Sequence, residues 1–446
     1  MKSIQISCLS VLLVLSSGMV GANDLIAIYQ QAILEDPQLA YAREALGVVK
    51  EKQSQASSAL FLPEANLNAN INQDRQNVQL GGVGATGESG RSTFMYGGYT
   101  LTLTQPILHY DRIVAWQQSD IKIAQAEAEY AAAEINLLLR VTERYFDALS
   151  AMDNVKFAQA QVNTLARGLK EVQQRQLVGY LAMTDVQEAQ AGYDRALADA
   201  VEAEHILNDA KEALQEVTGA RIESLAGLSE KIPLVPPDPT DEELWVKQAI
   251  SQNLSLLVSD LAVKIAEADI DIEKAGHLPT LNAVGSQSFL TSGGRFGSAN
   301  IEDTVIGMAL NVPLYQGGQV NSKIRAAEHR HREMMANLKQ SQRTVHRVTS
   351  KAYLGVITGV SRIKALKQAV ISSQTGLKAT QAGFYAGRRT TLDVITAEAA
   401  LLRAQKDYAR SRYDYVLNTL RLKQSVGVLS PEDIQKVNSW LTVNQQ

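Results

Sequence analysis

The chain has 446 residues, of which 20% are charged and 45% hydrophobic, with a formal net charge of -4 and a pI near 6.0. This length is ample for a buried core or for more than one domain. Because the charges are mixed along the sequence and leave no basic footprint, we expect no nucleic-acid partner.

The first 22 residues have the pattern of an export signal. Lys2 gives a positive start, an apolar stretch follows, and Ala22 ends a run of small residues suited to cleavage. The only cysteine, Cys8, lies inside this segment. We therefore expect a signal peptide over 1–22 and an exported mature chain without disulfide or lipid anchor. Beyond it we find no apolar run of about 18 residues, so any membrane insertion must use strands.

Between Pro63 and Pro106 apolar and polar residues alternate, as they do in strands. Over residues 65–72 every second residue is apolar and the residues between are asparagines. Over residues 99–104, Tyr99 and two leucines alternate with threonines, and a glycine-rich loop separates the two stretches. The pattern predicts a β-hairpin with strands of about 9 to 11 residues, the length of a tilted membrane crossing. One face suits lipid and the other water; a hairpin in a soluble sandwich is the alternative.

Three aromatic residues lie in the second of these strands. Phe94, Tyr96 and Tyr99 are close together near one end of it. Two interpretations are open: an aromatic belt at a membrane interface, or packing within the sheet.

The segments between Pro106 and Pro233, and between Pro313 and Pro431, contain no proline and are free to be helical. Apolar residues recur in them at every seventh position, the spacing of a coiled coil. The returning helix of the first segment also has alanines at every seventh position, which lets two helix backbones approach closely. If residues 107–178 form one helix, it extends about 108 Å, so we expect an elongated assembly.

The second half of the chain repeats the first. Tyr145 and Tyr353, Gly179 and Gly387, and Asp185 and Asp393 are each 208 positions apart. A second hairpin is predicted with strands at 280–290 and 304–312. A fixed spacing of this kind is the mark of tandem repeats. We expect a first repeat over 23–232, a proline-rich linker over 233–240, a second repeat over 241–428 and a C-terminal segment over 429–446. Each repeat consists of a helix, a β-hairpin and a long helical hairpin.

Each long helical hairpin reverses at a glycine. Gly179 and Gly387 are suited to left-handed helix caps, and the helices that follow each carry a capping-box pattern. We expect Thr184 with Gln187 in the first box, and Thr390 with Asp393 in the second. Both tips should lie at the same end.

The strand count bears on assembly. Four strands do not close, since the smallest membrane barrels have about eight, and open edges are not tolerated in hydrocarbon. Copies of the chain must therefore pool their strands. Two copies would give eight strands and three would give twelve, and the strand count leaves both open.

Four segments carry a family resemblance: DLIAIYQQAILEDPQL near the start, VPLYQGGQVNSKI at 312–324, and the turns VGYLAMTDVQEAQAGYDRAL and AGRRTTLDVITAEAALLRAQ. They resemble the TolC family of outer-membrane efflux and secretion channels over nearly the whole mature chain. The resemblance implies a mixed α and β homotrimer of a Gram-negative bacterium, with a transmembrane β-barrel in outer-membrane lipid and a periplasmic α-helical barrel. It implies no catalytic activity and no cofactor or metal. It also implies two partners: a periplasmic adaptor (membrane fusion) protein and an inner-membrane transporter of RND, ABC or MFS type.

The resemblance further implies that the tunnel closes at the hairpin tips. Arg389 matches a latch arginine with Thr184 as its partner, Asp185 matches the acid of the neighbouring tip, and Asp393 matches an aspartate that rings the constriction. The alternative for Asp393 is that it only completes its capping box near a helix start, where a carboxylate is favourable.

The chain departs from the family pattern at two positions of this gate. Phe384 replaces a tyrosine and Thr396 replaces a second aspartate, so we expect a weaker latch and a less charged ring. Three tip residues are the expected adaptor-docking surface: Gly179, Gly387 and Arg388. Arg388 either supplies a substitute latch contact or is a solvated surface residue.

Two further motifs and one rival function are set aside. Residues 82–87 match G-x-G-x-x-G by letter, but no βαβ unit surrounds them. His329 and Glu333 make at most a two-ligand pair on a helix, normally a surface pair. The rival is an elongated coiled-coil spacer or trimeric adhesin anchored by strands. A strand hairpin in each half of the chain argues against it.

Overall fold

The computed structural model describes residues 24–79, 90–293 and 297–442. The predicted signal peptide and the glycine-rich segment 82–87 lie outside these residues. None of the helices in the described part of the chain is both long and apolar enough to cross a membrane.

Four strands form one antiparallel sheet in the order β1-β2-β4-β5. They are β1 (Glu64–Val78), β2 (Gly90–Leu108), β4 (Thr280–Ser292) and β5 (Ala299–Asn311). With 15, 19, 13 and 13 residues they are longer than the predicted strands. The residues at the loop end of β1 and β2 are largely polar and do not alternate with apolar ones, so the prediction missed them. They still pair with each other in the antiparallel ladder, which continues to the pair Val78–Gly90.

One face of this sheet is apolar and exposed. Leu67 lies opposite Leu101, and both are directed to the same side because cross-strand partners share a face. Ile71 is 79% exposed, and Ile306 on β5, which the strand register puts on the same face, is 89% exposed. The opposite face of β1 carries asparagines.

The aromatic residues of β2 do not share one face. Tyr99 stacks on Phe289 of β4, with ring centroids 5.9 Å apart. Phe94 and Tyr96 lie on the opposite face, because an uninterrupted register makes even and odd positions of β2 point to opposite sides. A belt of all three residues on one face is therefore excluded, and Tyr99 takes part in packing within the sheet.

The same order of elements occurs twice along the chain. The first half contains α2 (Pro37–Phe61), β1, β2, α3 (Tyr110–Leu177) and α4 (Met183–Thr218). The second contains α6 (Leu254–Lys274), β4, β5, α7 (Gln319–Tyr385) and α8 (Thr391–Val426). Six shorter elements complete the described chain: α1 (Leu25–Glu35), β3 (Gly227–Leu228), α5 (Glu242–Gln252), the 3-10 turn η1 (Ala275–His277), α9 (Pro431–Asn438) and β6 (Leu441–Thr442).

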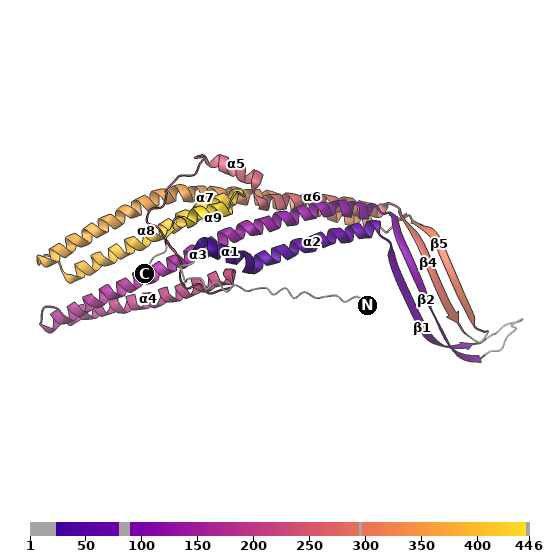
Figure 1. The fold of residues 1–446 in the computed structure, drawn as a ribbon, viewed down its shortest axis with the longest axis horizontal. Coiled ribbons are helices and arrows are strands. Elements are labelled where there is room, and N and C mark those ends of the chain that lie inside the picture. Colours follow the sequence, from indigo (N-terminus) through magenta and orange to yellow (C-terminus); the bar gives the residue numbers. More distant parts are fainter. Residues whose placement is uncertain (1–23, 80–89, 294–296, 443–446) are drawn as a thin grey trace, which may run out of the picture. The chain divides into compact units, whose positions relative to one another are not determined.

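The chain divides into two compact units, each built from both halves of the sequence. The strand unit comprises Ala40–Ala133 and Gln248–Arg347, and the tip unit comprises Met1–Leu39, Glu134–Lys247 and Val348–Gln446. Figure 1 labels the helices α1 to α9 and the strands β1, β2, β4 and β5.

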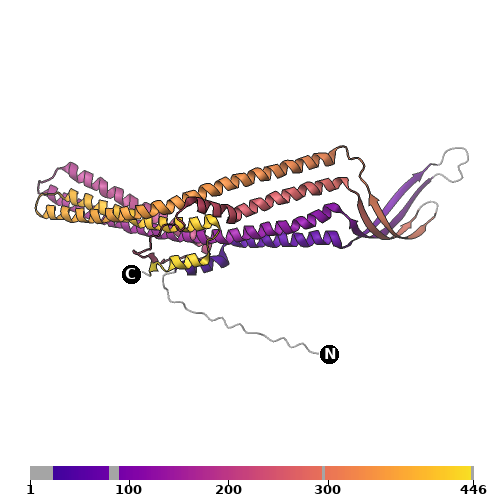
Figure 2. The same cartoon turned by 90° about the horizontal axis from the view of Figure 1, so that it is seen from above.

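In the strand unit the helices follow the order α2-α3-α6-α7, which is also the order of their strands (Figure 2). Gln53 of α2 donates to Asp120 of α3 at 2.6 Å. Gln118 of α3 donates to Asp269 of α6 at 2.6 Å. The Ser259 hydroxyl of α6 donates to the Ser341 hydroxyl of α7 at 3.3 Å. Each helix thus contacts the next across the unit.

The tip unit has an aromatic core. Phe146 of α3 is fully buried and packs on Tyr413 of α8, with ring centroids 5.6 Å apart. The Tyr413 hydroxyl donates to the Asp153 carboxylate at 2.6 Å. Burial and this carboxylate raise the pKa of Tyr413 above its ordinary value, so the hydroxyl stays protonated and remains a donor.

The coiled-coil spacing is confirmed in the α3–α4 hairpin. Val162 of α3 is buried against Ala196 and Ala200 of α4. Ala196 is one of the alanines that recur at every seventh position of the returning helix, and Ala200 belongs to a second set of apolar residues with the same spacing. Close approach of the two backbones is what alanine at these positions permits.

Candidate functional site

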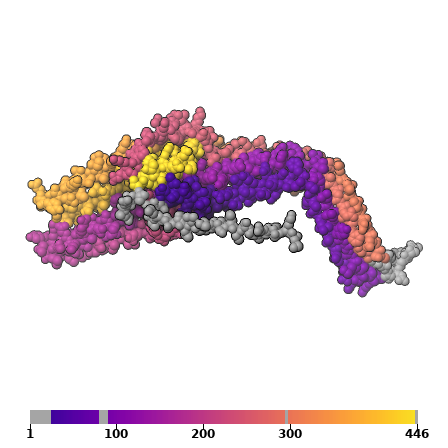
Figure 3. Space-filling model, viewed as in Figure 1, coloured from indigo at the N-terminus to yellow at the C-terminus, as the bar shows by residue number. Residues whose placement is uncertain are grey.

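The two hairpin tips of the tip unit reverse at glycines with left-handed backbones, as predicted. Gly179 has φ +78° and Gly387 has φ +71°. In the first tip the Tyr180 amide donates to the Arg175 carbonyl at 2.9 Å, and in the second the Arg388 amide donates to the Gly383 carbonyl at 2.8 Å. These are the bonds that satisfy the last carbonyls of a helix. The two tips lie side by side at one end of the unit (Figures 1 and 3).

The predicted capping box of α8 is confirmed. The Asp393 carboxylate accepts from the Thr390 amide at 2.8 Å and from the Thr390 hydroxyl at 3.0 Å, while the Asp393 amide donates back to that hydroxyl at 3.2 Å. The donors of Thr390, with a smaller contribution from Arg389, hold the pKa of Asp393 below its ordinary value. The carboxylate is therefore charged at neutral pH.

The predicted box of α4 is wrong. Helix α4 starts at Met183, which makes Ala182 the N-cap and Asp185 the third residue of the helix. The Asp185 carboxylate accepts from the Ala182 amide at 2.8 Å. Thr184 lies inside the first turn and is exposed. A carboxylate in the first turn is a stronger partner for free amides than Gln187, which explains the shift.

The other predicted gate residues lie on the same two tips. The Arg389 guanidinium is 4.0 Å from the Asp393 carboxylate in its own tip. In the described part of the chain Arg389 has no hydrogen bond to Thr184. The Thr396 hydroxyl donates to the Leu392 carbonyl at 2.8 Å and carries no charge to the site. Arg388 is exposed.

The sequence did not reveal a carboxylate that links the two hairpins near their tips. The Glu171 carboxylate of α3 accepts from the Thr391 hydroxyl of α8 at 2.6 Å and from Arg175 at 2.8 Å. Arg175 in turn lies over the ring of Phe384, 5.6 Å from its centroid, a cation–π contact. Glu171 and Arg175 are four residues apart on a helix, a spacing from which an ion pair can be predicted. Their contacts with α7 and α8 depend on tertiary register, which the spacing does not give.

Close packing surrounds this link. A side chain added at Gly168 of α3 would have its Cβ 2.0 Å from the Ile395 Cδ1 of α8. Arg167 makes an ion pair with Glu398 at 2.9 Å. Next to these contacts is a cavity of about 490 Å³ whose lining includes Asp185 and Thr391. The two hairpins therefore touch at Gly168 and diverge around a cavity at their tips.

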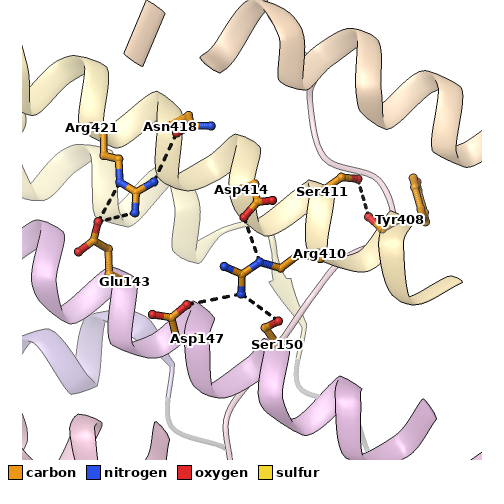
Figure 4. Close-up of polar contacts among 9 residues, drawn as sticks. All are labelled: Glu143, Asp147, Ser150, Tyr408, Arg410, Ser411, Asp414, Asn418 and Arg421. Atoms are coloured by element: carbon orange, nitrogen blue, oxygen red, sulfur yellow. Dashed lines mark hydrogen bonds and ion pairs between the residues drawn. The ribbon is translucent and has the colours of Figure 1, made fainter. Parts of the chain in front are cut away.

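Farther from the tips a row of ion pairs joins α3 and α8 (Figure 4). Arg410 contacts Ser150 at 3.1 Å and Asp147 at 3.5 Å, and Arg421 contacts Glu143 at 2.8 Å. The higher-numbered arginine of α8 contacts the lower-numbered residue of α3, so the two helices run antiparallel. We name this row the α3–α8 seam. It contains two charged pairs between the helices, whereas the hydrogen-bonded link at the tip is centred on the Glu171 carboxylate.

The pair of His329 and Glu333 lies on α7. Glu333 is engaged by Arg330 at 2.6 Å. Across the described ranges, no group of three or more metal-ligating side chains is found.

Long helical hairpins that alternate with β-hairpins recur in solved structures. The CmeC outer membrane channel of Campylobacter jejuni superposes with a TM-score of 0.75 at 15% identity, over 100% of this chain and 99% of that one. The family model described as outer membrane efflux protein matches residues 28–220 and 245–428. The chain therefore belongs to the outer membrane efflux protein family.

Curated relatives agree with this assignment. The outer membrane protein TolC of Vibrio cholerae is 34% identical over 96% of this chain and 96% of its own length. The alkaline protease secretion protein AprF of Pseudomonas aeruginosa is 30% identical over 76% of this chain and 71% of its own length. The chain is an outer-membrane protein of the TolC type, and the rival interpretation as a spacer or adhesin is not favoured.

Proposed function

We propose that three copies of this chain form a passive exit duct through the outer membrane and periplasm. The observation that carries the proposal is the open four-stranded sheet. Within the described residues, β1 and β5 each pair on one side only, and the sheet exposes an apolar face. Since β1 and β5 run in opposite directions, β5 of one copy can pair antiparallel with β1 of the next. Closure satisfies both edges and turns the apolar face to lipid.

The helices continue this barrel as a tunnel in the periplasm. We further infer that the two halves of the chain are tandem copies, so that each subunit supplies two equivalent helical hairpins. The duct performs no catalysis, and its energy comes from an inner-membrane transporter contacted through a periplasmic adaptor. The tips around Gly179, Gly387 and Arg388 are the docking surface for these partners.

The tips close the duct by a latch between neighbouring copies. Arg389 is exposed beside Asp393 and is free to reach Thr184 and Asp185 of an adjacent tip. The substitutions Arg389→Ala and Thr184→Ala should raise the single-channel conductance of purified trimers in planar bilayers. Gln173→Ala, at an exposed position of α3, is the control. Unchanged conductance in both latch variants would refute the latch.

Asp393 gives the closed end its preference for cations. Three carboxylates around a narrow opening attract cations, because low-dielectric walls focus their field. Asp393→Asn should move the reversal potential in a salt gradient toward zero, whereas Asp209→Asn, at an exposed position of α4, should not.

The same charge sets the pH dependence of this preference. Because the pKa of Asp393 is lowered, its charge is complete at neutral pH and is lost only as pH falls through that lowered pKa. Cation preference should therefore persist below the pH at which an ordinary aspartate titrates. Loss of the preference at mildly acidic pH would contradict this assignment.

A further inference from the structure

The long helices of the tip unit form a row with α4 and α7 at its edges. Helix α3 packs on α4 at Val162 and is joined to α8 by the α3–α8 seam. Helix α8 packs on α7, since a Cβ added at Gly359 of α7 would lie 3.6 Å from the Tyr415 ring of α8. The order of the row is therefore α4-α3-α8-α7.

The two edge helices carry opposite charge. Helix α4 has nine Asp or Glu residues and two Lys or Arg residues, whereas residues 348–385 of α7 have five Lys or Arg residues and no Asp or Glu. Across the described residues, none of these five bases is in an ion pair. Opposite charges favour contact between the two edges and disfavour contact of either edge with its own equivalent.

The 208-residue spacing relates the pair α3 and α8 to the pair α7 and α4. The ends of the helices keep this spacing: α3 ends at Leu177 and α7 at Tyr385, while α4 and α8 both begin and end 208 positions apart. The α3–α8 contact thus has a counterpart in which α7 replaces α3 and α4 replaces α8. Because α4 and α7 are at opposite edges of one copy, this counterpart forms only between two copies. It rests on the closed assembly and the tandem repeat proposed above.

Two glycines mark the point of closest approach. A Cβ added at Gly168 of α3 would lie 2.0 Å from Ile395 of α8. The equivalent residue of α7 is Gly376, and a Cβ added there would meet nothing within 4 Å. Glycine is unfavourable in a helix interior, and no contact in the described chain requires it at this position. The counterpart of Ile395 is Gln187 of α4, which fills this space when it comes from a neighbouring copy.

The aromatic core of the seam has an uncovered counterpart. Phe146 of α3 is fully buried against Tyr413 of α8. Its equivalent on α7 is Leu354, which is 50% exposed, and the equivalent of Tyr413 on α4 is His205, which is exposed. A surface that is buried within the chain in one repeat is therefore open in the other.

A polar contact of the seam has a chemically matched counterpart. Arg410 of α8 donates to the Ser150 hydroxyl of α3 at 3.1 Å. Their equivalents are Glu202 of α4 and Thr358 of α7, and both are exposed. A threonine hydroxyl donates to a carboxylate, so the pair remains compatible with the direction of the hydrogen bond reversed.

We propose that α7 of each copy packs on α4 of the next through this face, with Gly376 against Gln187 and Thr358 against Glu202. The basic edge of one copy thereby meets the acidic edge of its neighbour. This pairing sets the order of copies around the ring, and the tip of each copy is completed by the next.

Crosslinking tests the register. The single cysteine, Cys8, lies in the segment expected to be removed, so introduced cysteines are the only thiols of the mature chain. In purified full-length protein, Glu202→Cys with Thr358→Cys should give covalent dimers and trimers with a short bis-maleimide. Glu202→Cys with Ala365→Cys is the matched control. Ala365 is also exposed but is displaced along α7 by one heptad, or about 10 Å, so its yield should be several-fold lower.

Substitution of Gly376 tests the close approach. Gly376→Leu should lower the temperature at which trimers dissociate and leave the helical circular dichroism unchanged, because the side chain has room within the chain but not at the contact between copies. Gly47→Leu is the matched control, at an exposed glycine of α2 whose added Cβ also meets nothing within 4 Å. It should leave the trimers as stable as those of the unmodified protein.

The outcomes separate this inference from the proposed function. Light scattering of the unmodified protein first establishes the oligomer. Trimers in which the matched pair fails to crosslink, in which the displaced pair crosslinks equally well, or in which Gly376→Leu is as stable as Gly47→Leu, would overturn this contact and leave the duct proposal intact. Monomers throughout would overturn both.

Discussion

Glu171→Ala is expected to give trimers of several-fold higher conductance than the unmodified protein. The carboxylate accepts hydrogen bonds from both Thr391 of the second hairpin and Arg175 of the first. Its removal leaves the half-buried Arg175 guanidinium without its acidic partner and breaks a charge-assisted hydrogen bond between the hairpins. Among the described contacts, the α7–α8 tip is then held by packing near Gly168, by the exposed Arg167–Glu398 pair and by the contact of Arg175 with the Phe384 ring. Single-channel recording in planar bilayers measures the effect.

Two controls accompany this measurement. Gln173→Ala alters an exposed position on the same turn of α3 and should conduct like the unmodified protein. Thr391→Val removes only the hydroxyl donor and should give an intermediate conductance. If Glu171→Ala conducts like Gln173→Ala, Glu171 does not hold the tips together.

Phe146→Ala is expected to have the largest effect on stability, about 3 to 5 kcal/mol. The ring is fully buried between Tyr145 and Tyr413, so its removal loses apolar burial and leaves a cavity where α3 meets α8. Guanidinium unfolding followed by helical circular dichroism measures the loss, at one fixed protein concentration because assembly contributes to stability.

Phe157→Ala serves as the comparison for this variant. Phe157 is also on α3 but is only half-buried, beside an open groove. Its replacement should cost clearly less. Equal losses for the two substitutions would show that the aromatic core is not the main stabilising contact between the hairpins.

Local patterns were sufficient for the helices, the strands and half of the tip. The proline-free span and the tip glycine gave α3 nearly to its ends. The left-handed glycines and the Thr390–Asp393 box follow from residues adjacent in the chain. The polar ends of β1 and β2 were missed because their pairing comes from the ladder rather than from alternation. The start of α4 was predicted wrongly because two caps fit the spacing, Thr184 with Gln187 and Ala182 with Asp185, and the spacing alone does not choose between them.

The tip link was out of reach of the sequence for a different reason. Glu171 and Thr391 are 220 residues apart, and their contact depends on how α3 packs on α8. The α3–α8 seam has the same origin. The latch between copies depends on assembly and stays a prediction.

The proposed trimer is a continuous duct closed at its tips. Purified trimers of the unmodified chain and of the variant Glu171→Ala with Arg389→Ala should be recorded in planar bilayers under identical conditions. We expect small, cation-preferring steps for the unmodified chain and much larger steps for the variant. Stable trimers of the variant that carry no current would contradict the account.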